Sequence, residues 1–92
     1  MEEKFRKAWE TCRREAEALG VRMRPVEADA LAQARRILSG HRPSDGFNQL
    51  EKLGRLDLSL EALAVSGRFT ALFDDTQANH ALELLMEAGF FG

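Results

Sequence analysis

Cysteine, proline and long apolar runs are scarce in this sequence of 92 residues. A single cysteine, Cys12, excludes an intrachain disulfide framework and fits a reducing compartment. No apolar run approaches the roughly 20 residues that a membrane-spanning helix needs. The start, MEEKFRKAWE, is charged and has no apolar core, so we expect no signal peptide there. These absences together predict a cytoplasmic protein that does not enter a membrane.

Motifs for catalysis, metal binding and nucleotide binding are also missing. There is no glycine-rich phosphate loop, no Ser/His/Asp pattern and no CxxC or HxxxH pair. His80, Glu83 and Glu87 would share a helix face, but metal sites usually draw ligands from more than one element. Cys12 lies on an apolar stripe, where a thiol behaves as a small hydrophobic residue. We therefore predict no enzyme, no cofactor and no metal site.

What the sequence does contain is typical of one small folded domain, residues 1–92. Hydrophobic residues make up 45% and charged residues 30%, as in ordinary soluble domains. Alanine and leucine occur thirteen times each, whereas valine, isoleucine and threonine together number seven, a balance that favours helix over strand. We predict an all-α bundle of about five helices, with two longer charged helices in residues 3–40 and an apolar helical cluster in residues 44–92.

The first predicted helix, residues 3–19, carries a narrow apolar stripe with heptad-like spacing. Two interpretations stay open for this stripe. It packs on the core of the domain, or it is a seam that pairs with a partner, including a second copy of the chain. The residues of this candidate interaction seam are Phe5, Trp9, Cys12, Ala16 and Leu19.

A second helix is predicted for residues 25–39, with Pro25 in its first turn and Gly40 after its end. This half of the chain is the more basic one: residues 1–46 hold ten Lys/Arg against eight Asp/Glu, and residues 47–92 hold three against seven. Arginine suits carboxylate and phosphate groups because its guanidinium presents a planar fork of donors. The candidate basic patch consists of Arg22, Arg24, Arg35, Arg36 and Arg42.

The last third of the chain is predicted to fold as short capped helices. A helix over residues 45–53 would be capped by Ser44 or Asp45 and turn Leu53 inward. Ser59 would cap a helix over residues 60–66, and residues 68–73 would form one helical turn that buries two phenyl rings. Asp74 or Asp75 would then cap a helix over residues 76–88.

The packing of that last helix can also be predicted. Its buried stripe would consist of Ala78, Ala81, Leu82, Leu85 and Met86, and Leu82 would lie beside Phe69 and Phe73. Gly89 would sit after the helix in a left-handed conformation, with Phe90 completing a Schellman ending. Phe90 and Phe91 would then fold back onto the domain.

These features favour a small non-enzymatic module for protein–protein interaction, an adaptor or a regulatory subunit. Its partner would be another protein or a second copy, the latter through the first helix. The alternative is a domain that binds nucleic acid or regulates transcription with the basic N-terminal half. An overall pI near 5.7 and interleaved acidic residues argue against that alternative.

Overall fold

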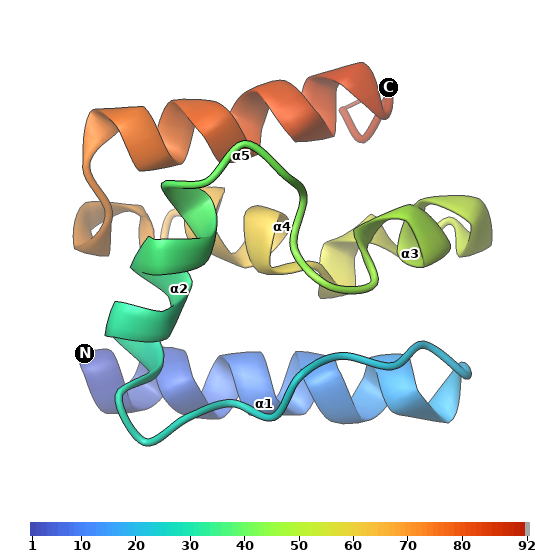
Figure 1. The fold of residues 1–92 in the computed structure, drawn as a ribbon, viewed down its shortest axis with the longest axis horizontal. Coiled ribbons are helices and arrows are strands. Elements are labelled where there is room, and N and C mark those ends of the chain that lie inside the picture. Colours follow the sequence, from blue (N-terminus) through green and yellow to red (C-terminus); the bar gives the residue numbers. More distant parts are fainter. Residues whose placement is uncertain (92) are drawn as a thin grey trace.

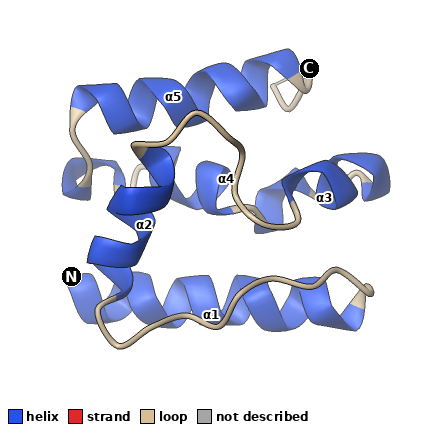
Figure 2. Cartoon of the chain, in the orientation of Figure 1, coloured by secondary structure: helices blue, strands red, loops and turns tan. Residues whose placement is uncertain are grey.

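Five α-helices and two short 3₁₀ turns build the protein, seen in a computed structural model that describes residues 1–91 (Figure 1). The described residues contain no strand (Figure 2), so the predicted all-α class is confirmed. None of the helices in this range is long and apolar enough to span a membrane. The elements are α1 (Glu2–Ala18), α2 (Ala30–Leu38), α3 (Phe47–Leu53), η1 (Leu56–Leu58), α4 (Leu60–Val65), η2 (Thr70–Leu72) and α5 (Asp75–Glu87).

Helices α1 and α5 lie on opposite sides of the molecule, and α2 crosses steeply between them (Figure 1). α2 packs against both α1 and α5, while α4 packs along α5. Two apolar clusters fill the interior between these helices. One surrounds Phe5 and contains side chains from α1, α2, α4 and α5, and the other surrounds Leu50 and joins the ends of α1 and α5 to α3 and η1.

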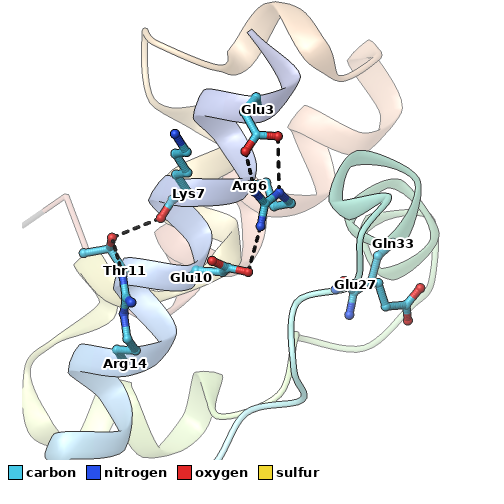
Figure 3. A network of polar contacts seen from close by, with 8 residues as sticks. All are labelled: Glu3, Arg6, Lys7, Glu10, Thr11, Arg14, Glu27 and Gln33. Atoms are coloured by element: carbon cyan, nitrogen blue, oxygen red, sulfur yellow. Dashed lines mark hydrogen bonds and ion pairs between the residues drawn. The ribbon is translucent and has the colours of Figure 1, made fainter.

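The outer face of α1 is a ladder of charged and polar side chains (Figure 3). Arg6 bonds Glu3 and Glu10 on adjacent turns, and Thr11 donates its hydroxyl proton to the carbonyl of Lys7. Such exposed pairs contribute at most about 1 kcal/mol each. They keep this face solvated and leave the opposite stripe of α1 to pack inward.

The second helix is shorter than predicted, because α2 begins at Ala30 and not at Pro25. Asp29 caps it by accepting a hydrogen bond from the backbone N–H of Ala32 at 3.2 Å. The buried amide of Gln33 accepts from the N–H of Glu27 at 2.8 Å and donates to the carbonyl of Pro25 at 3.1 Å. These two bonds supply partners that a helical turn would otherwise provide, so the segment before Asp29 stays non-helical.

The third helix also begins later than predicted, because neither Ser44 nor Asp45 caps it. Gly46 precedes α3 with φ +81°, and a Cβ atom there would lie 2.7 Å from Cγ1 of Val21. Only glycine fits this position, since it alone accepts both the left-handed backbone and the close approach. Leu53, predicted to point inward, is half exposed at the end of α3.

The predicted caps of the later helices are confirmed. The Ser59 hydroxyl accepts from the N–H of Ala62 at 3.1 Å at the start of α4. Asp74 and Gln77 form a reciprocal capping box at the start of α5. The turn η2 brings Phe69 and Phe73 into the core, as the sequence predicts.

The prediction of which α5 residues are buried is only partly correct. Ala81 and Leu85 are fully buried, but Leu82 is 37% exposed and Met86 is 62% exposed, and Gln77 is buried instead. The helix is thus rotated from the predicted face, because the side of α5 that meets α2 and α4 carries Gln77, Ala81 and Leu85. Leu82 is therefore not buried with Phe69 and Phe73. The aromatic ring that packs on both Phe69 and Phe73 is that of Phe5.

The Schellman ending of α5 is confirmed, but the position of its phenylalanines is not as predicted. The N–H of Phe90 bonds the carbonyl of Leu85 at 2.9 Å, and that of Gly89 bonds the carbonyl of Met86 at 3.1 Å. Phe90 and Phe91 nevertheless remain 38% and 58% exposed. Their rings pack on each other edge to face, with centroids 5.1 Å apart, and Phe91 keeps more than half of its surface exposed.

Candidate functional site

The stripe on α1 faces the interior. Phe5, Trp9 and Ala16 are buried in the two core clusters, Cys12 is partly buried, and Leu19 is exposed at the end of the helix. This burial agrees with the interpretation in which the stripe packs on the core of the domain. Trp9 lines an open cavity with 4% of its surface exposed, whereas a partner can reach Phe5 and Ala16 only if α1 leaves the core.

The environment of Cys12 disfavours the thiolate. Burial raises the pKa of the thiol, and the carboxylates of Glu15 and Asp57 raise it further, while Arg68 opposes this weakly. Activated cysteines need the opposite, a pKa lowered by nearby cations or a helix N-terminus. The thiol therefore has the character of a small packing residue.

The arginines of the basic patch divide into separate groups. Arg24, Arg36 and Arg42 line one open cavity of about 480 Å³, beside the end of α2. Arg35 points elsewhere, since its guanidinium donates to the carbonyl of Leu72 at 2.7 and 3.1 Å and ties α2 to η2. Arg22 is exposed and does not line the cavity. The structure thus brings three of the five predicted residues together.

The cavity between α2 and the loop of residues 40–45 is lined by both charged and apolar side chains. Met23, Ile37 and Pro43 are partly exposed and supply apolar surface, whereas Trp9 and Leu60 are 4% and 0% exposed behind them. His41 and Asp45 join the arginines. Arg24 pairs with Asp45 at 3.0 Å and Arg36 with Glu27 at 3.3 Å, all four side chains being well exposed. Arg42 has no ion pair among residues 1–91.

A buried carboxylate holds the loop that forms one wall of this cavity. Glu61, with no exposed surface, accepts the backbone N–H of Ser44 at 2.7 Å and the Ser44 hydroxyl at 2.6 Å. Hydrogen bonds to a charged acceptor are stronger than neutral ones, and here they join residues 17 positions apart. We call this arrangement the Glu61–Ser44 clasp.

The clasp was not predicted from the sequence, although the sequence contains one signal for it. Glu61 and Ala64 lie three positions apart, so both belong to the same face of α4, and Ala64 is fully buried. A glutamate on an apolar helix face needs a partner when it is buried. Nothing local in the sequence identifies Ser44 as that partner.

A second feature is an apolar surface on the outer side of α5 and its C-terminal turn. We call it the α5 surface. Its members are four of the seven exposed large hydrophobic side chains in residues 1–91: Leu82, Met86, Phe90 and Phe91. Leu82 and Met86 are one turn apart on the helix, and the Schellman turn fixes the backbone that carries Phe90. The exposed side chains of Glu83 and Glu87 accompany these residues on the helix.

No cluster of three or more His, Cys, Asp or Glu side chains suited to a metal ion occurs in residues 1–91. Searches with protein-family models, curated proteins and solved structures find no match to this chain. Its function must therefore be inferred from its own two surface features, the cavity beside α2 and the α5 surface.

Proposed function

We propose that this chain is a small non-enzymatic interaction module, an adaptor or regulatory subunit, which binds another protein through the α5 surface. The observation that carries this proposal is the exposure of Met86 and Phe91 by 62% and 58%, next to Leu82 and Phe90. Large apolar side chains gathered on one part of a small protein are typical of an interaction site. Aromatic residues and methionine are also enriched in protein interfaces.

The backbone of this surface is held in place before a partner arrives. The capping box fixes the start of α5, and the two Schellman hydrogen bonds fix its end. A preformed surface loses less conformational entropy on binding than a disordered segment does. A phenylalanine buries about 150–250 Å² when it is fully covered, and Phe90 and Phe91 still expose 38% and 58% of their surface, so each ring can bury that remaining part as an anchor of an interface.

Site-specific photocrosslinking tests this proposal. A photoreactive p-benzoyl-phenylalanine placed at Phe91 is expected to form a discrete crosslinked product with another protein when the chain is expressed in its native host. The matched control carries the same residue at Glu15, an exposed position on α1. The expected crosslinking yield at position 91 is at least about tenfold that at position 15, which corresponds to about 1.4 kcal/mol of preference.

Equal yields from the two positions, or no product from position 91, would show that the α5 surface is not an interface. Sedimentation velocity of the purified chain separates the two kinds of protein partner. A monomer that still crosslinks in the host indicates a different protein. A dimer that Phe91→Ser dissociates indicates a second copy.

A further inference from the structure

The geometry points to a binding site for a small organic anion in the cavity beside α2. The ligand would have an apolar body and one carboxylate or phosphate group. This inference is independent of the proposed partner surface on α5. It rests on the combination of the partly exposed apolar residues Met23, Ile37 and Pro43 with three arginines around one open space.

The size of the cavity suits such a ligand. Its volume of about 480 Å³ lies within the range of about 300–1,000 Å³ that is usual for small-molecule sites. Those sites combine apolar walls with a few convergent polar groups that fix the orientation of the ligand. Here the apolar surface can take the body of the ligand, and the guanidinium groups can take its charged end.

The arginine side chains at the cavity suit an anion. Arg24, Arg36 and Arg42 line it, and Asp45 is the single carboxylate among the lining residues. Asp45 and Glu27 pair with Arg24 and Arg36, so no large excess of positive charge remains, and the attraction comes from the guanidinium donors themselves. A guanidinium can bond a carboxylate or phosphate through two parallel N–H groups.

The existing ion pairs do not block this role. Arg24 and Asp45 are 76% and 45% exposed, and Arg36 and Glu27 are 65% and 57% exposed. Ion pairs this exposed contribute little to stability, so an incoming anion can replace or share the partner. Arg42, without an ion pair in residues 1–91, has its guanidinium available at once.

The Glu61–Ser44 clasp gives the site a fixed wall. It anchors the loop that carries His41 and Arg42 to the buried face of α4. Leu60, the residue before Glu61, lines the same cavity. Because the loop is anchored before binding, little entropy is lost when Arg42 contacts a ligand.

Trp9 provides the test, since it is the single tryptophan of the chain and lines the cavity. Titration with phenyl phosphate and with 3-phenylpropionate is expected to change the fluorescence of Trp9 in a saturable way, and 2-phenylethanol is expected to have no such effect. Arg36→Gln and Arg42→Gln are each expected to weaken the binding of phenyl phosphate at least about tenfold, the effect of one lost charge-assisted contact. The matched control, Arg22→Gln, removes the same charge outside the cavity and is expected to change the affinity less than about twofold.

Two further binding measurements complete the test. A capped peptide with one phosphotyrosine reveals the source of the ligand: binding as tight as that of phenyl phosphate indicates a partner's side chain, and weaker binding indicates a free molecule.

Equal binding of the neutral alcohol, or an equal loss in Arg22→Gln, would overturn the proposal. So would tight, strongly salt-dependent binding of mixed-sequence DNA that phenyl phosphate does not displace, since that indicates a nucleic-acid surface. Crosslinking from position 91 is unaffected by any of these outcomes.

Discussion

Phe5→Ala is expected to lower the free energy of unfolding by about 3–5 kcal/mol. Phe5 has no exposed surface and lies at the centre of an aromatic group. Its ring meets Phe69 and Phe73 edge to face, with centroids 5.4 and 5.5 Å apart, and Trp9 in a tilted arrangement at 5.8 Å. Truncation removes these contacts and leaves a cavity that the surrounding helices can fill only in part.

The effect is large relative to the whole stability of such a chain, which is on the order of 5–14 kcal/mol for this length. Urea-induced unfolding followed by circular dichroism measures it. The matched control is Phe91→Ala, the same substitution at a side chain that is 58% exposed, with an expected cost below about 1 kcal/mol. Similar costs at the two positions would mean that the aromatic group around Phe5 is not the centre of the core.

The second large effect is expected at the clasp. Glu61→Gln should lower the free energy of unfolding by about 2–3 kcal/mol. A glutamine side chain can still accept the N–H of Ser44 and donate to its hydroxyl oxygen, but both hydrogen bonds become neutral and the hydroxyl proton of Ser44 loses its acceptor. Hydrogen bonds to a charged group contribute about 1.5–3 kcal/mol against about 0.5–1.5 kcal/mol for neutral ones, so the loss over two bonds is about 2–3 kcal/mol.

Hydrogen exchange at the Ser44 amide gives a local readout of the same change. In Glu61→Gln this amide is expected to exchange faster, because its acceptor is lost or weakened. Glu51→Gln makes the same chemical change at an exposed position of α3 and should alter stability by less than about 0.5 kcal/mol. Unchanged exchange at Ser44 together with wild-type stability of Glu61→Gln would show that the clasp does not hold the loop.

The features that were predictable from the sequence are set by neighbouring residues. Ser59 and Asp74 cap helices whose first turns begin at the next residue, and α5 ends around Gly89 through hydrogen bonds that reach back three and five residues. Such signals depend on side chains within one or two turns. They are therefore present in the sequence whatever the rest of the fold does.

The features that were missed depend on residues far apart in the chain. Gln33 keeps the segment before α2 non-helical, and Ser44 bonds Glu61 instead of capping α3. The face of α5 is chosen by the helices that meet it, which leaves Leu82 and Met86 outside. Periodicity identifies an apolar stripe, but the partners that are present decide how much of it is covered.

The candidate site was likewise predictable only in the part that depends on neighbouring residues. The arginine-rich composition of the N-terminal half is visible in the sequence and indicates an affinity for anions. Which arginines share a cavity is not visible there. Arg35 is adjacent to Arg36 in the chain, yet it bonds the carbonyl of Leu72, whereas Arg42 reaches the cavity from a separate loop.

We propose that the stripe on α1 belongs to the core and that the partner binds the α5 surface. One measurement tests it most directly: photocrosslinking from position 91 in two variants, Trp9→Phe and Met86→Asp, with the free energy of unfolding of each. Met86→Asp is expected to keep its stability within about 0.5 kcal/mol and to lose at least about tenfold in crosslinking, because a charge would be buried in the interface. Trp9→Phe is expected to lose stability but to crosslink as the unmodified chain does. The opposite pattern, with crosslinking lost in Trp9→Phe and kept in Met86→Asp, would contradict the claim and place the interface on α1.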